Sequence, residues 1–283
     1  MEARIQEIKD LFYDDKLQDA YKKLRTLEGE LSSDPSSLDL LNSTEEINIL
    51  RDDLKEADRC LELLADLDSW NPIKETENIA IFSKTSNVDF IIRAEMLLDQ
   101  PIFPVLSICN EIDLLPSWIQ VVKSVETVKT ITPFRRLLWY KFNIPWPASN
   151  RDMVVNAFGL TIPENNSIMI ILRDVSESKF LGTDIPQPDS GDVRVTMKTG
   201  ILSFMKRSET QTQVSFLSHS DPHVPLVPES LLNWCSKTGI YYFIKSMEDK
   251  AMGFKGSIFE ERVAANQAFY NKLMSVLNEA LGE

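Results

Sequence analysis

The stretch IPWPASNRD, residues 144–152, places two prolines, a tryptophan and an Arg-Asp pair between two long apolar segments. Those segments, RRLLWYKFNI (135–144) and RDMVVNAFGLTI (151–162), are rich in β-branched and aromatic residues, which predicts strands. Pro145 and Pro147 fix φ and cannot donate hydrogen bonds to a neighbouring strand. They therefore predict a corner at which one strand ends and the next begins.

The other residues of this corner are predicted to be structural. We expect Trp146 to fill the turn. We expect Arg151 to pair with a carboxylate or with backbone carbonyl groups, because charged pairs at strand starts usually hold the strand in place. The alternative is that Arg151 and Asp152 grip a ligand directly.

Residues of the same types predict further strands on both sides of the corner. These strands are 78–85, 89–99, 125–132, 167–176, VRVTMKTGILSFMKR and TQTQVSFLSH. The connections are too short for helical crossovers, so we expect an antiparallel sheet. Helices are predicted for PIFPVLSICNEI, for a long segment after Pro228 and for the final segment from residue 257.

A single antiparallel sheet of this length has to curl. A helix across its concave side would leave an apolar hollow of the kind that holds small ligands. The predicted fold class is therefore α+β: a curved antiparallel sheet with a long C-terminal helix over an internal cavity, preceded by an all-α arm.

The pleat predicts which side chains would face the hollow. If Tyr140 points inward, every second residue of its strand does so too, and the long helix adds an apolar face at i, i+3, i+4 spacing. The expected lining is Leu138, Tyr140, Phe142, Met153, Val155, Ala157, Leu232, Cys235, Phe243 and Met247. A plain sheet core would contain the same residue types, so only a continuous void would make them a site.

Charge divides the chain near residue 68. Residues 1–69 hold 19 acidic and 9 basic residues, a net charge of −10 out of −13 for the whole chain. Apolar residues in this segment repeat at three- and four-residue spacing, which predicts helices. We expect an arm at 1–67, a central domain at 68–252 and a tail helix at 253–283. The arm either packs as three helices or binds a protein partner.

Groups suited to catalysis are scarce. The chain has two histidines, His219 and His223, and lacks a nucleophile elbow, a P-loop and a zinc-protease motif. His219, Asp221 and His223 would share a face of an extended strand and could hold a metal, but the Asp-Pro pair favours an exposed loop. The three cysteines form no CxxC pair, which is typical of structural thiols in a reducing compartment. We expect no enzyme activity, no cofactor and no metal.

The charge pattern also constrains the partners. An acidic protein repels phosphates, so nucleic acid is not expected. The charged first residues do not resemble a signal peptide, and the apolar runs are far below the ~20 residues that span a bilayer, so a cytoplasmic protein is expected. The basic pairs at 135–136 and 206–207 are expected to be solvated strand edges. The alternative is a patch that faces anionic lipid.

The segment IPWPASNRDMVV resembles the START lipid-transfer domain, in which a Pro-aromatic-Pro corner precedes small polar residues, Arg-Asp and a strand. Further segments match in the same order: SWNPIKETENIAIFSK, LPSWIQVVKSVETV, VSESKFLGTDIPQPDSGDVRV and SDPHVPLVPESLLNWCSKTGIYYFIKSM. The resemblance covers about residues 68–252. It implies a helix-grip fold that holds one lipid and carries it between membranes or presents it, without covalent chemistry.

The same resemblance bears on the cargo. Sterol-binding members often place an acid and an arginine where this chain has Leu138 and Ala157. The phosphatidylcholine-transfer-like branch is closer in the corner and the long helix. However, its phosphate-binding arginine corresponds to Leu115, and only Tyr140 remains of its aromatic choline cage, whereas a quaternary ammonium needs several π faces. A phospholipid is expected over a sterol, without choline selectivity. Lys198 could meet a phosphate if its strand faces inward.

These observations leave several hypotheses. The leading one is an intracellular carrier that exchanges one lipid during transient membrane contact, when the loop at 182–192 and the C-terminal helix part. The alternative is a non-enzymatic lipid sensor whose arm, residues 1–67, binds a protein partner. A third is an enzyme that uses the cavity for hydrolysis or cyclisation, which requires polar residues inside it.

Overall fold

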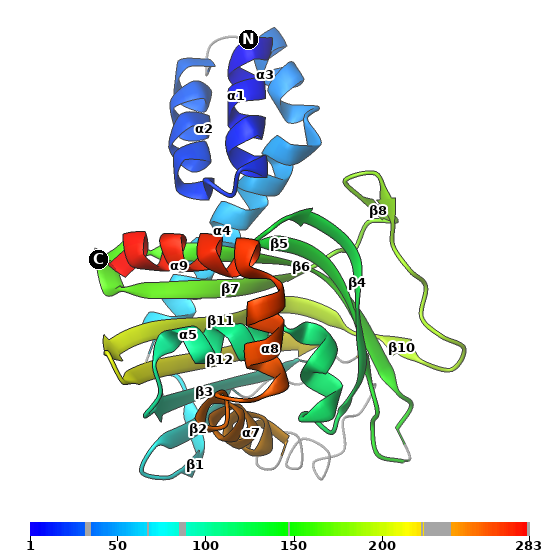
Figure 1. The fold of residues 1–283 in the computed structure, drawn as a ribbon. Coiled ribbons are helices and arrows are strands. Elements are labelled where there is room, and N and C mark those ends of the chain that lie inside the picture. The colour runs from blue at the N-terminus through cyan, green and yellow to red at the C-terminus, as the bar shows by residue number, and fades with distance from the viewer. Residues whose placement is uncertain are drawn as a thin grey trace.

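A large curved sheet surrounds a group of helices, and a helical arm extends beyond one end of it in the computed structural model of the chain (Figure 1). The structure describes residues 1–31, 35–66, 68–84, 89–146, 148–221, 223 and 239–281. Among these residues, no helix is both long enough and apolar enough to cross a membrane.

The predicted strands are present and form one sheet. The sequence analysis did not predict β1, a short strand that pairs with β2 at the edge of this sheet. The strands are β1 (Asn71–Glu75), β2 (Ile79–Lys84), β3 (Phe90–Leu98), β4 (Val122–Thr132), β5 (Arg135–Phe142), β6 (Arg151–Ile162), β7 (Ser167–Asp174), β10 (Val193–Arg194), β11 (Thr196–Ser208) and β12 (Gln211–Asp221). Across the sheet they follow the order β1-β2-β3-β12-β11-β7-β6-β5-β4. Neighbours in this order pair antiparallel, as predicted, whereas the short β10 lies parallel to β6. A separate ribbon joins β8 (Lys179–Phe180) to β9 (Thr183–Asp184).

The pleat sorts the apolar side chains of the sheet into two cores. Leu138 and Val155 belong to the core on the concave face, whereas Leu137 and Val154 belong to the core on the convex face. Because successive side chains point to opposite faces, neighbouring residues of one strand enter different cores. The sheet therefore has helices packed on both of its faces.

The concave face is covered by helices from the middle and the end of the chain. They are α5 (Ile102–Asn110), α7 (Ile240–Met252), α8 (Ile258–Ala265) and α9 (Gln267–Leu281), and a 3₁₀ turn at Ile112–Ser117 follows α5. The final segment was predicted as one helix, but the chain turns at Asn266, which has non-helical dihedrals. This turn lets α8 pack against α5 and α9 lie along β6 and β7 (Figure 1).

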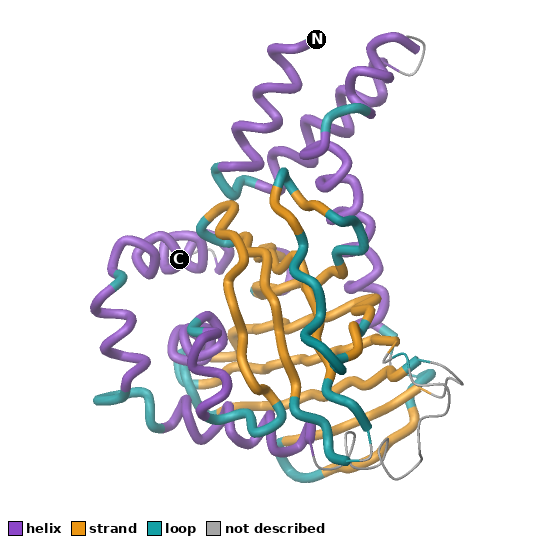
Figure 2. The backbone as a smooth tube through the Cα atoms, turned by 90° about the vertical axis from the view of Figure 1, so that its right-hand side faces the viewer, coloured by secondary structure: helices purple, strands orange, loops and turns teal. Residues whose placement is uncertain are grey.

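The arm forms four described helices instead of the expected three. They are α1 (Glu2–Tyr13), α2 (Leu17–Leu31), α3 (Pro35–Asn42) and α4 (Glu45–Ala65). The additional α3 begins at Pro35, inside the segment predicted as a break, since proline is well tolerated in the first turn of a helix. The long α4, the last helix of the arm, extends beyond the other three and runs along the convex face of the sheet (Figures 1 and 2).

A buried ion pair joins the arm to the sheet. Arg135 of β5 donates through Nη2 to Oδ2 of Asp53 in α4 at 2.6 Å, and 1% of the Arg135 side chain and 0% of the Asp53 side chain are exposed. The guanidinium carbon lies 4.7 Å from the ring centres of both Phe12 and Phe158. Removing either side chain would leave the other charge buried without a partner, which lowers the stability of the folded protein. The arm is therefore held to the sheet by this pair as well as by its apolar core.

We predict that Asp53→Asn lowers the free energy of unfolding by about 3–5 kcal/mol, because it leaves the Arg135 charge without its partner. Thermal or urea unfolding of the full chain measures the change. Asp52→Asn is the matched control, since Asp52 is about half exposed and lies 3.5 Å from Arg173, whose guanidinium also lies 3.6 Å from Asp53. An exposed pair contributes at most about 1 kcal/mol. Equal losses in the two variants would contradict the proposed role of the buried pair.

Candidate functional site

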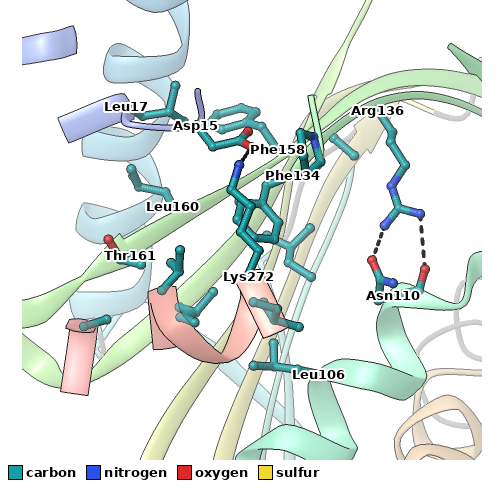
Figure 3. A pocket seen from close by; sticks show the side chains of 18 of the residues that line it. Asp15, Leu17, Leu106, Asn110, Phe134, Arg136, Phe158, Leu160, Thr161 and Lys272 are labelled. Atoms are coloured by element: carbon teal, nitrogen blue, oxygen red, sulfur yellow. Dashed lines mark hydrogen bonds and ion pairs between the residues drawn. The ribbon is translucent and has the colours of Figure 1, made fainter. Parts of the chain in front are cut away.

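A cavity of about 530 Å³ lies mostly on the concave face of the sheet and extends to Phe158 and Leu160, which belong to the convex-face core. Its walls come from β5, β6, β7 and β11 of the sheet, from α5 and α9, and from the turn between α1 and α2. Figure 3 shows side chains from these elements converging on one space. A void of this size is within the range that holds small ligands.

The floor of the cavity is apolar and includes part of the predicted lining. Leu138, Tyr140 and Ala157 line the cavity, together with Ile170 and Leu172 of β7. The period-two alternation of β5 and β6 was the signal that predicted the first three, and the structure places them on the concave face. Their contact with a ligand stays a prediction.

The other predicted residues lie near the cavity or outside the described chain. Met153, Val155 and Met247 are buried in the same core, and Phe142 packs against it. Phe243 stacks on Trp118 with ring centres 6.1 Å apart. None of these is among the described residues that line the void. The remaining two, Leu232 and Cys235, lie outside the described residues.

A cationic side chain forms the polar end of the cavity. Arg136 reaches from β5 to the C-terminal end of α5, where it donates to the Oδ1 atom of Asn110 and, at 3.3 Å, to the backbone carbonyl of the same residue (Figure 3). Asn110 donates in turn to the hydroxyl of Tyr270 at 3.1 Å. Burial lowers the pKa of Arg136 from its usual value. It also raises the pKa of Tyr140 to about 12, so that the phenol stays neutral at physiological pH.

The expectation that Arg135 and Arg136 are solvated strand edges is therefore wrong. One of them enters the arm core and the other the cavity, because β5 starts at Arg135 and its pleat directs the two side chains to opposite faces. Extending the alternation of β5 by one step from Leu138 would have identified Arg136. Lys198 instead forms an ion pair with Asp89 at 2.6 Å and does not line the cavity in the described structure.

The mouth of the cavity is bounded by the arm and the tail. Lys272 of α9 pairs with Asp15 in the turn between α1 and α2, with Nζ and Oδ2 2.9 Å apart (Figure 3). Thr132 donates a hydrogen bond to the same carboxylate. The ammonium also lies 5.2 Å from the ring centre of Phe134. The sequence offered no signal for this contact, since its partners are 257 positions apart.

The proline corner differs from expectation at its tryptophan. Trp146 is 91% exposed, so the prediction that it fills the turn is wrong. Asp152 is fully buried and accepts hydrogen bonds from Trp139 and Arg194, at 2.7 Å each. Arg151 donates to the carbonyl oxygen of Ser149 at 2.6 Å. These contacts hold β6 in place and leave the indole of Trp146 in solvent.

The two histidines lie away from the cavity, and the one described cysteine that lines it is protonated. His219 bonds to Asp89 at 2.9 Å, and His223 bonds to the backbone of Arg194, away from the void. The thiol of Cys109 lines the cavity, but burial raises its pKa to about 12, which keeps it protonated and unreactive. Within the described ranges, no cluster of three or more His, Cys, Asp or Glu side chains could hold a metal ion.

Comparison with known proteins finds several that are similar to this chain in sequence or in structure. The mouse phosphatidylcholine transfer protein is 25% identical over 169 residues, which span 53% of this chain and 75% of that protein. The crystal structure of human STARD10 is similar with a TM-score of 0.61 at 15% identity, over 74% of this chain and 82% of that chain. Human StAR-related lipid transfer protein 5 gives a TM-score of 0.60 at 17% identity, over 71% of this chain and 94% of that chain.

These similarities agree with the match of a family model. The model of the START domain matches residues 56–253, which include α5, the curved sheet and α7. The match spans well over half of the 283 residues. On this basis, with the fold and the cavity described above, the chain belongs to the START domain family.

Proposed function

We propose that this protein is a lipid carrier that holds one lipid in the concave-face cavity and exchanges it at membranes. The observation that carries this proposal is the void of about 530 Å³ with an apolar floor, in a chain of the START domain family. Burying acyl or ring carbons there would contribute roughly 25 cal/mol for each Å² removed from water. No covalent chemistry is needed for this activity.

A phospholipid is the proposed cargo in preference to a sterol. Leu138 and Ala157, where sterol-binding relatives often have an acid and an arginine, are apolar and line the void. The similarity to the phosphatidylcholine transfer protein supports the same choice. Choline selectivity is not proposed, because Tyr140 stacks on Phe142, 6.0 Å between ring centres, instead of forming part of an aromatic cage.

The arm and the tail are proposed to serve the same cavity. The α1–α2 turn and α9 lie outside the matched segment 56–253, yet both line the void. We keep the division into an arm at 1–67, a lipid-binding domain at 68–252 and a tail at 253–283. In this division the two outer segments close the mouth of the central domain.

Membrane contact is proposed to involve the proline corner. Trp146 presents almost its whole side chain to solvent, beyond the ends of β5 and β6. Tryptophan is favoured where an apolar ring meets a polar headgroup region. A protein that works at membranes only transiently would be expected to reside in the cytoplasm between contacts.

A lipid sensor is the second candidate. The helices of the arm extend beyond the sheet and leave apolar side chains such as Leu40 and Tyr13 exposed, at 39% and 42% (Figure 1). Such a surface is available to a protein partner. A vesicle-to-vesicle transfer assay separates the two functions, because a sensor would bind lipid without accelerating its exchange.

We predict that Ala157→Trp lowers the lipid content of the purified protein at least tenfold, because the indole occupies the void. Native mass spectrometry of the full chain measures the bound lipid, and thermal unfolding checks the fold. Ala264→Trp on the exposed face of α8 is the matched control and should leave loading unchanged. Unchanged loading in Ala157→Trp would show that the cargo is held elsewhere.

We predict that Trp146→Ala reduces binding to phospholipid vesicles several-fold, since the lost indole no longer inserts among the headgroups. Co-sedimentation and transfer rate are the measurements. The free energy of unfolding should change by less than about 0.5 kcal/mol, as for other exposed positions. Leu40→Ala removes an exposed apolar side chain from the arm and should bind vesicles as the unmodified protein does. Equal binding by both variants would argue against docking through the corner.

A further inference from the structure

Among the described residues, no carboxylate forms an ion pair with Arg136. Its guanidinium donates to the two oxygen atoms of Asn110, which are neutral amide oxygens. Glu111 and Asp113 are close enough to influence the guanidinium electrostatically, but both have other partners. Glu111 accepts from the hydroxyl of Tyr270, and Asp113 pairs with Arg262 at 2.8 Å.

The position of the Arg136 guanidinium stabilises its positive charge, but the neutral side chain of Asn110 does not cancel that charge. Asn110 is the last residue of α5, and carbonyl groups at a helix C-terminus attract positive charge. A guanidinium has five N–H donors in a planar fork, and the two hydrogen bonds to Asn110 do not exhaust them. A buried cation with spare donors gains most from an oxyanion, which can accept two hydrogen bonds at once.

The surroundings suit a ligand with one charged end and an apolar body. Leu106, Leu138 and Leu172 line the same void as Arg136. Lys272, another of the cations that line the cavity, is paired with Asp15, and Figure 3 shows this pair apart from that of Arg136 with Asn110. The remaining lining cations, Lys16 and Lys22, are exposed. A quaternary ammonium next to Arg136 would be repelled, and a sterol hydroxyl would gain less than an anion.

We infer that Arg136, held by Asn110, binds the oxyanion of an acidic lipid, a phosphate or a carboxylate, inside the cavity. This inference rests on the proposed function, because it assumes that the cavity holds the cargo. The acyl body lies along the apolar floor, and the charged end is directed towards α5. The cavity thereby selects lipids with a net negative charge over sterols and over zwitterionic choline lipids, in which the quaternary ammonium next to the phosphate would be repelled by Arg136.

The test uses the delipidated full chain, incubated with phosphatidylcholine vesicles that contain equal fractions of phosphatidic acid, oleate and cholesterol. Native mass spectrometry reports which lipid is retained. We expect phosphatidic acid, oleate or both to be retained at least tenfold over cholesterol and phosphatidylcholine, as charge-assisted hydrogen bonds in a desolvated site predict. The preference between the first two identifies the phosphate or the carboxylate as the natural group.

Variants of Arg136 isolate its contribution. Arg136→Met should reduce the preference for acidic lipid at least tenfold while total occupancy by neutral lipid stays or rises. Arg136→Lys, which keeps the charge but not the fork, should be intermediate. Arg136→Gln is a second neutral variant that can still donate to Asn110, and it decides the question if Arg136→Met does not fold. Lys255→Met removes an exposed cation that does not line the void and should leave the preference unchanged.

The outcomes separate this inference from the proposed function. An unchanged lipid preference in the folded neutral variants would overturn the role of Arg136, whereas retained cargo would still support a carrier. A loss of preference in Lys255→Met equal to that in Arg136→Met would show that general positive charge, and not a specific contact, causes the preference, and it would also overturn the inference. If the unmodified chain retains no lipid, both the inference and the proposed function fail.

Discussion

The ion pair between Arg135 and Asp53 constrains the rest of the structure. A guanidinium enclosed between two phenylalanine rings has to keep its carboxylate, because water cannot reach it. This requirement fixes α4 against the convex face and fixes the register of β5 at its first residue. The same register directs Arg136 to the opposite face, since successive side chains of a strand alternate. One pair of adjacent arginines therefore ties the arm to the sheet and provides the cavity with its charge.

The cavity depends on parts of the chain that the START domain model does not match. The sheet and α5 supply its floor and its polar end within the matched segment, whereas α9 and the α1–α2 turn supply its mouth. Their ion pair, Lys272 with Asp15, joins segments from opposite ends of the chain. The matched segment thus supplies most of the apolar lining, and the segments outside it add α9 and the α1–α2 turn. Because part of the cavity lining lies outside the matched segment, similarity to other family members says more about the fold of this chain than about its cargo.

Several features could be predicted from sequence because they follow from local periodicity. The strands on both sides of the proline corner, the antiparallel pairing and the inward positions of Leu138, Tyr140 and Ala157 agree with the structure. Predictions that required knowledge of distant neighbours did less well. Arg136 was expected at a solvated edge and Trp146 inside a turn, and their environments are the reverse. Whether a charged or aromatic side chain is buried depends on which segments cover it, and composition does not report this.

The sequence by itself determined the helices and strands, the alternation of side chains along each strand and the resemblance of the proline corner to the START domain. These features follow from the periodicity of neighbouring residues. The tertiary structure alone decided which segments cover each arginine, that a void remains between the sheet and α9, and that the indole of the corner stays in solvent. These properties depend on contacts between residues far apart in the sequence, from 26 positions for Arg136 with Asn110 to 257 for Lys272 with Asp15. Packing of that kind depends on shape and desolvation in three dimensions, which no local pattern encodes.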